Sequence, residues 1–325
     1  MTPLSILTIF EKKMFESPPI FTGRDRKKYF TFPVGITKIS QKLDSQNKIY
    51  FLVIYGYFKA TNKFYTRQFY QKDLDFVAEK LNITDDGNAG YNKRTYLNHR
   101  ETILAYCGCK KFTPVIIPSL ILQLAPLIRS HTRPKTILFQ SCELLSKQKI
   151  EIPSYHTLAT IITEELKRHQ KELEQTLSNL LTEEHKQMLD NLLTKSPASY
   201  RYQLTLLKTF THSTKPIKIK ENITDFLLLK ELFATLGSLL KTVELTPEGM
   251  KYYAYCVSKF RMPQVQRREG IERYLYLTCF IIHQFYILQD IFLDVIILAV
   301  QAGHNKAVAQ HGLAVVNGKK TTISE

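Results

Sequence analysis

The residues best suited to metal chemistry lie close together in the first third of the sequence. Cys107 and Cys109 are separated by one glycine, and His99 precedes them by about two helical turns. A structural zinc site needs four ligands in spaced pairs, and the sequence offers no second pair. We therefore interpret Cys107 as a buried side chain and Cys109 as incidental. The odd total of five cysteines is typical of reduced thiols in a cytosolic protein.

Two carboxylates, Asp290 and Asp294, could share one face of a helix and hold a divalent ion. Nuclease or strand-transfer chemistry needs a third carboxylate and a supporting sheet, so we interpret the pair as a polar helix face. Residues 183–185, Glu-Glu-His, follow Thr182 and are typical of a helix start. The sequence contains no Walker-type phosphate loop, dinucleotide-binding glycine pattern, zinc-protease motif or nucleophile elbow. We expect neither catalysis nor a cofactor.

The charge of the chain indicates a polyanionic partner. The 325 residues carry a formal net charge of +16, with a pI near 9.5. Residues 91–149 hold ten basic and two acidic side chains, and residues 201–220 hold five basic and none acidic. Charge concentrated in this way indicates binding of duplex nucleic acid, whereas charge that serves only solubility would be spread over the surface.

The elements that would position these charges are predicted to be helices. Glycine is sparse and strand-like alternation is rare, so we expect an all-α fold of multi-helix bundle modules. Thr22 and Asp25 have the spacing of a capping box. The apolar residues 49–58 would suit a buried strand or a buried helix, and the flanking helical pattern favours the helix. Residues 71–109 predict two helices separated by a break at 84–90.

A second helix pair has the pattern of a helix-turn-helix. Residues 135–148 and 153–172 each have one apolar face, and about five residues connect them. Ser154 is a natural N-cap for the second helix. The second helix of such a unit presents its first turns to the major groove. We expect Tyr155, His156, Thr157, Thr160 and Thr163 to point outward at this end.

The candidate DNA-binding residues are the polar and basic side chains expected on the outer faces of residues 92–102 and 154–163 and on the basic segments between them. Those expected to read or track the duplex are Arg94, His99, Arg100, Tyr155, His156 and Thr157, and those expected on phosphates are Lys93, Lys110, Lys111, Arg133 and Lys135. Arg100 lies near the apolar face of its helix, so an alternative is that it braces the protein.

Residues 274–300 form an apolar stretch that could be a membrane-spanning helix or a buried helix of a helical domain. Its uncharged part, 274–289, is shorter than the roughly 20 residues that a span requires. His283 falls on the same stripe as the two aspartates. We therefore expect a nearly buried helix in a large helical domain, with membrane association as an alternative.

Several phrases in a consistent order carry a resemblance to a known family. They include Phe-Glu-Ser-Pro-Pro at 15–19, Gly-Tyr-Phe-Lys-Ala at 56–60, Ile-Pro-Ser-Tyr-His-Thr-Leu at 152–158 and Arg-Tyr-Leu-Tyr-Leu at 273–277. Over residues 10–301 the chain resembles the amino-terminal region of class II (Tn-three family) replicative transposases. The resemblance implies recognition of the terminal inverted repeats of a transposon by helical modules.

In such transposases a later ribonuclease-H-like domain carries Asp-Asp-Glu chemistry with magnesium, and we expect this sequence to stop before that domain. The predicted organisation is a first DNA-binding module over 1–112, a helix-turn-helix module over 113–195, a helical linker or scaffold over 196–302 and a divergent tail over 303–325. The expected partners are double-stranded DNA and either a second copy or an intact transposase, in the cytoplasm at the nucleoid and without a membrane.

Besides membrane association, three alternatives stay open at this point. The chain could be a non-specific DNA- or RNA-binding protein, a regulator that inhibits an intact transposase, or a complete small nuclease or recombinase. Equal binding of folded RNA would indicate the first, unchanged transposition on co-expression would exclude the second, and magnesium-dependent nicking would indicate the third.

Overall fold

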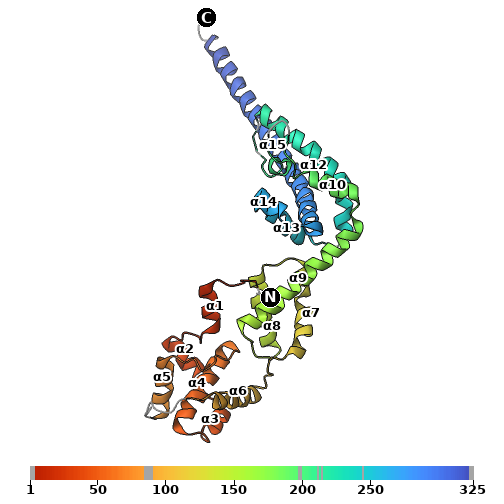
Figure 1. Ribbon diagram of the computed structural model, residues 1–325. Coiled ribbons are helices and arrows are strands. Elements are labelled where there is room, and N and C mark those ends of the chain that lie inside the picture. The colour runs from red at the N-terminus through yellow and green to blue at the C-terminus, as the bar shows by residue number, and fades with distance from the viewer. Residues whose placement is uncertain are drawn as a thin grey trace. The chain divides into compact units, whose positions relative to one another are not determined.

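The computed structural model describes residues 4–83, 91–196, 200–210, 212–213, 215–243 and 245–321 (Figure 1). The predicted all-α fold is confirmed, because 75% of the chain is helical and the described residues contain isolated β-bridges but no strand. The predicted break at 84–90 lies outside the described residues.

The helices follow one another with short connections. From the amino terminus they are α1 (Ile9–Glu16), α2 (Gly23–Tyr29), α3 (Val34–Ser40), α4 (Ser45–Thr61), α5 (Gln71–Leu81), α6 (Lys93–Cys107), the 3-10 turn η1 (Pro114–Ile116), α7 (Ile117–Arg129), α8 (Pro134–Lys147) and α9 (Tyr155–Leu180). They continue with α10 (Glu183–Asn191), α11 (Gln203–Leu206), α12 (Pro216–Thr242), α13 (Pro247–Lys259), α14 (Met262–Gln266) and α15 (Gly270–Thr321).

The chain divides into two compact units. Unit 1 contains Met1–Ile128 and Thr132–Arg168, and unit 2 contains Arg129–His131 and His169–Glu325. Helix α9 begins in unit 1 and ends in unit 2. It extends eight residues beyond the predicted end at 172 because Leu173 and Leu177 continue its apolar face, and both are buried.

Unit 1 contains two hydrophobic clusters, and α4 is the centre of the first. The predicted helix at 49–58 is confirmed, and nine residues of α4 are buried. Gly56 permits the closest contact, because a Cβ at this position would lie 2.3 Å from the ring of Phe30. The predicted capping box of Thr22 and Asp25 starts α2. Cys107, expected to be buried, is only partly buried at the edge of this cluster.

The second cluster of unit 1 is built by α7, α8 and α9. Leu120 and Leu124 of α7 pack with Ile137 and Leu138 of α8 and with Leu158 of α9 in one buried group. The predicted pairing of two amphipathic helices over 135–148 and 153–172 is therefore confirmed as local packing. Ser154 caps α9 as expected, since its Oγ accepts a hydrogen bond of 3.2 Å from the N–H of Thr157.

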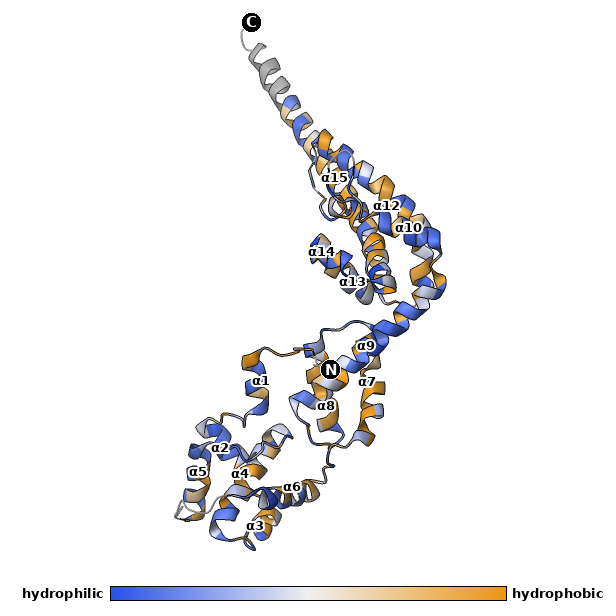
Figure 2. Cartoon of the chain, viewed as in Figure 1, coloured by the Kyte–Doolittle hydropathy of each residue, from blue (hydrophilic) through white to orange (hydrophobic). Residues whose placement is uncertain are grey.

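The core of unit 2 lies where α12 and α13 pack against the first half of α15. From Tyr274 to Phe285 every residue except His283 is buried, as predicted for the apolar stretch. From Tyr286 to Val300 only one face of the helix is buried, so the expectation of a nearly buried helix is wrong for this half. Figure 2 shows apolar residues continuing along α15 there.

One described helix, α15, is long and apolar enough over Gly270–Gln310 to cross a membrane by length and composition. A core helix of a soluble protein passes the same test. The burial of its first half against α12 and α13 is typical of a core helix, whereas only 22% of the apolar window that passes the test is buried.

Candidate nucleic-acid interface

All of the candidate DNA-binding residues lie in unit 1, and all except His99 and Arg100 occur in four places. The first is the start of α6, where Asn92 caps the helix by accepting a hydrogen bond of 2.8 Å from the N–H of Thr95. Lys93 and Arg94 occupy the first turn, and both side chains are exposed. They are free to contact a phosphate, as the sequence predicts, although basic side chains at the amino end of a helix oppose its dipole.

The second place is a cluster of three exposed lysines, Lys110, Lys111 and Lys149, which we call the lysine cluster. Backbone hydrogen bonds bring it together: the N–H of Lys110 donates to the carbonyl of Lys149 at 2.7 Å, and the N–H of Glu151 donates to the carbonyl of Lys110 at 3.0 Å. Within the described part of the chain, none of the three lysines forms an ion pair.

The backbone turn that ends α8 places Lys149 in this cluster. Lys149 adopts a left-handed φ of 56°, and the N–H of Ile150 returns to the carbonyl of Leu145 at 2.8 Å. A lysine here has a backbone strain that glycine would avoid. The turn is fixed on its other side by Asn62, whose side-chain amide donates to the carbonyl of Ile150 at 2.6 Å. The positive charges are therefore held by a rigid backbone.

The third place is the start of α9, where the outcome is mixed. His156 is exposed and Thr157 is partly exposed, as predicted. Tyr155 and Thr163 are buried, so the expectation that they point outward is wrong. The hydroxyl of Tyr155 accepts hydrogen bonds from the N–H groups of Ile6 and Leu7, at 3.0 and 3.2 Å.

The amino-terminal segment also covers the first backbone amide of α9. The N–H of Tyr155 donates to the carboxylate of Glu16, and Lys12 lies over the ring of Tyr155 at 5.3 Å. The ammonium of Lys63, which is 5% exposed, lies 3.4 Å from the same carboxylate. Tyr155 therefore anchors α1 to α9, and this amide at the helix start is already satisfied by a protein carboxylate.

The fourth place is the start of α8, where Arg133 is exposed and precedes the helix. Lys135 is half exposed and forms an ion pair with Glu11. This contact, together with hydrogen bonds from Thr8, lowers the pKa of Glu11 to about 2. Arg133 is therefore free to contact a phosphate, whereas Lys135 would have to leave Glu11 to do so.

His99 does not lie on the DNA-facing surface that the sequence predicts. Its side chain is 5% exposed, packs edge-on against Phe51 with ring centroids 5.1 Å apart, and has Nδ1 2.6 Å from the hydroxyl of Tyr91. Burial lowers the pKa of His99 to about 4, so the imidazole is neutral at pH 7. His99 belongs to the core of the first cluster.

Arg100 takes the bracing role that the sequence left open. Its guanidinium makes two hydrogen bonds to the carboxylate of Glu151, one of 2.9 Å through Nε. The side chain of Glu151 is 3% exposed, and it also accepts a 3.0 Å hydrogen bond from the N–H of Phe112. The ion pair joins α6 to the segment that carries Lys149, so Arg100 helps to hold the lysine cluster in place, and its side chain stays 25% exposed.

The side chains that could bind a metal or act as a nucleophile do not assemble into a site. Within the described residues, no group of three histidine, cysteine, aspartate or glutamate side chains could hold a metal ion. Burial raises the pKa of the Cys107 thiol to about 11, so it is protonated at neutral pH.

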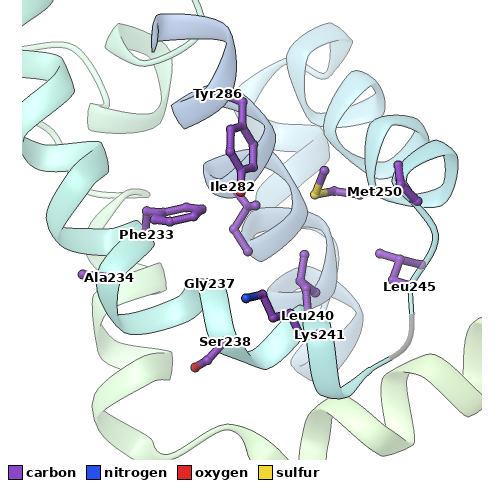
Figure 3. A pocket seen from close by; sticks show the side chains of 11 residues that line it. Phe233, Ala234, Gly237, Ser238, Leu240, Lys241, Leu245, Met250, Ile282 and Tyr286 are labelled. Atoms are coloured by element: carbon purple, nitrogen blue, oxygen red, sulfur yellow. The ribbon is translucent and has the colours of Figure 1, made fainter.

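Unit 2 contains a pocket of about 370 Å³ between α12, α13 and α15 (Figure 3). Its walls are mostly apolar side chains such as Phe233, Met250 and Ile282, with Lys241 and Ser238 among the lining residues. Among the described residues that line it, there is no carboxylate, imidazole or thiol that could act as an acid, base or nucleophile.

Comparison with known proteins bears on unit 1 alone. Residues 6–165 match a family model described as a domain of unknown function, DUF4158. The match covers nearly all of unit 1 and ends close to the point where α9 passes into unit 2. Among curated proteins, none matches the sequence. The candidate interface therefore lies wholly within the matched domain.

Sequence reasoning missed Lys149 as a candidate, although it counted among the basic residues of 91–149. Its partners, Lys110 and Lys111, are nearly forty residues away along the chain. The signal that could have found it is the pair of short basic segments that follow α6 and α8, because each comes directly after a helix that packs in unit 1.

Proposed function

We propose that this chain binds double-stranded DNA through unit 1, recognises the terminal inverted repeats of a transposon and performs no catalysis by itself. The observation that carries the proposal is the lysine cluster, whose three ammonium groups are exposed and unpaired and sit on a backbone fixed by Asn62 and the Arg100–Glu151 ion pair. An array of this kind suits the phosphates of a duplex, because each lysine that neutralises a phosphate releases the counterions condensed there.

The start of α9 is the element best placed to contact bases. His156 and Thr157 are accessible, and they follow Lys149 by only a few residues. In a helix-turn-helix the first turns of the second helix enter the major groove while neighbouring cations contact phosphates. The resemblance to transposase amino-terminal regions supports the inverted repeat as the target, and the net charge of +16 supports a polyanion.

The experiment is a fluorescence anisotropy titration of a labelled duplex at several salt concentrations. Replacing Lys110, Lys111 and Lys149 one at a time by alanine should lower the slope of log K against log salt by about one for each phosphate that the protein no longer neutralises. A matched control is Lys251→Ala, an exposed lysine of unit 2. Unchanged slopes for all three cluster variants would overturn the assignment of this surface.

The second candidate function is non-specific binding of any polyanion. The observation that favours it is the distribution of basic residues outside the cluster, since residues 201–220 in unit 2 also carry five basic side chains and no acid. It predicts equal affinity for repeat-containing duplex, scrambled duplex and folded RNA.

A further inference from the structure

The pocket of unit 2 between α12, α13 and α15 has the size and the lining of a small-molecule site (Figure 3). Its volume of about 370 Å³ lies in the lower part of the range of ligand pockets, about 300–1,000 Å³. Such pockets are mostly apolar with a few polar groups, and here the polar side chains among the described lining residues are Ser238, Lys241 and Tyr286. Because no carboxylate, imidazole or thiol lies among them, the pocket suits binding and not catalysis.

Contacts within unit 2 hold the walls of the pocket in place. The ring of Phe233 stacks on Phe285, with centroids 4.2 Å apart, and meets the ring of Tyr286 edge-on at 5.5 Å. Ile282 of α15 is 4% exposed, and Met250 of α13 packs against the same core. A pocket whose walls are already ordered accepts a ligand without the cost of ordering side chains on binding.

Gly237 leaves space in the α12 wall of the pocket. It lies inside a helix of 27 residues, where glycine is less favourable than alanine. Its φ is not positive, and a Cβ at this position would meet nothing closer than the ring of Phe233 at 3.4 Å, an ordinary van der Waals contact. Neither the backbone nor the packing therefore requires glycine here, and the consequence of the missing side chain is a wider pocket.

Lys241 is the charged residue among the described residues that line the pocket. It lies one turn beyond Gly237 on α12 and is exposed, so its ammonium group is at the mouth. Within the described part of the chain it forms no hydrogen bond and no ion pair. A ligand with an anionic head and an apolar body matches this distribution, because the body buries apolar surface against Phe233 and Met250 while the head contacts the lysine. A cationic head would be repelled.

We propose that this pocket binds a free monocarboxylate with one unbranched apolar chain. The carboxylate contacts the ammonium group of Lys241 at the mouth, and the chain lies between Phe233, Met250 and Ile282. The site belongs to unit 2 alone, so it goes beyond DNA binding by unit 1 and does not depend on it.

Equilibrium dialysis of the full chain against labelled octanoate tests the class of ligand. Octanoate should bind, and each methylene added between butanoate and octanoate should raise the affinity about fourfold, the factor expected for one buried methylene. Octylammonium has the same chain and the opposite charge. It should compete at least about tenfold more weakly, because it loses one ion pair and gains a repulsion of similar size.

Two variants test the location. Gly237→Leu fills the pocket from α12 and should abolish octanoate binding, whereas the matched control Gly303→Leu, at a helical glycine of α15 with open space around it, should not. Lys241→Ala should weaken octanoate binding about threefold to fivefold, the loss of one exposed ion pair, and leave octanol binding unchanged. Its control is Lys230→Ala, an exposed lysine of the same helix that does not line the pocket. Thermal unfolding followed by circular dichroism checks that each variant is folded.

Four results would overturn the proposal. Octanoate that does not bind at millimolar concentration excludes the class of ligand, and equal competition by octanoate and octylammonium excludes the anionic head. Unchanged octanoate binding in folded Gly237→Leu, or in Lys241→Ala should the first variant unfold, excludes the pocket. Flotation with phosphatidylglycerol vesicles that is lost in Gly237→Leu, without binding of octanoate, would replace the free carboxylate with a membrane lipid.

Discussion

The Arg100–Glu151 ion pair gives the sharpest prediction about stability. Arg100→Ala would leave the carboxylate of Glu151, 3% exposed, with one described donor, the N–H of Phe112. Breaking a buried ion pair by removing one partner costs about 3–5 kcal/mol. The Arg100 side chain is 25% exposed, so water can partly replace it. We therefore expect Arg100→Ala to lower the unfolding free energy of unit 1 by about 2–3 kcal/mol.

With a urea m-value of about 2 kcal/mol/M, this loss lowers the unfolding midpoint of unit 1 by about 1–1.5 M. Hydrogen exchange of peptides from α8 and from the unit 1 part of α9, followed against urea, reports this unit separately from unit 2. The matched control is Arg94→Ala, an exposed arginine of the same helix, which should change the unfolding free energy of unit 1 by less than about 0.5 kcal/mol.

Adding Glu151→Gln to Arg100→Ala removes the buried charge, so the double variant should lose less stability than the sum of the two single variants. The bracing role is refuted if Arg100→Ala leaves the midpoint of unit 1 unchanged. A large loss of DNA affinity at unchanged stability would instead make Arg100 a DNA contact.

Three further predictions concern unit 1. The pKa of His99 is lowered in the folded protein from an ordinary value near 6.5 to about 4, so on acidification the unfolded chain takes up this proton first. Unit 1 should therefore lose stability as the pH falls from about 6.5 to 4. Urea titrations at each pH measure this dependence, and His99→Gln should flatten it. Tyr155→Phe leaves two backbone N–H groups without their acceptor and should cost about 1–3 kcal/mol, with faster exchange of the amino-terminal segment; unchanged exchange contradicts its anchoring role. Gly56→Ala puts a methyl group 2.3 Å from Phe30 and should cost about 1–3 kcal/mol in thermal unfolding, whereas Gly23→Ala, with open space around it, should not.

Local features of the fold were predictable because their causes lie within a few residues. The capping box of Thr22 and the cap at Ser154 depend on contacts three residues apart, and helical periodicity requires only the neighbouring turns. The apolar run at 49–58 became a helix as predicted, since its flanking residues continue the helical pattern.

The candidate interface was less predictable because its geometry depends on distant partners. On a helical wheel His99 looks like an outward polar residue, but Phe51 and Tyr91 enclose it. Tyr155 is buried because residues 6 and 7, nearly 150 positions away, bond to its hydroxyl. Helical periodicity identifies which residues share a face, and it carries no information about which distant segment covers that face.

The proposed function requires that unit 1 recognise a particular duplex. The most direct measurement is a gel-shift competition of the full chain on the DNA that flanks its coding sequence, where the proposal expects a terminal inverted repeat, with a scrambled duplex of the same composition as competitor and salt held at a physiological value. We predict a preference for the repeat of at least about a thousandfold, the range of specific protein–DNA recognition, and its loss in a His156→Ala/Thr157→Ala variant that keeps its affinity for scrambled DNA. Equal competition by the two duplexes would contradict sequence-specific recognition.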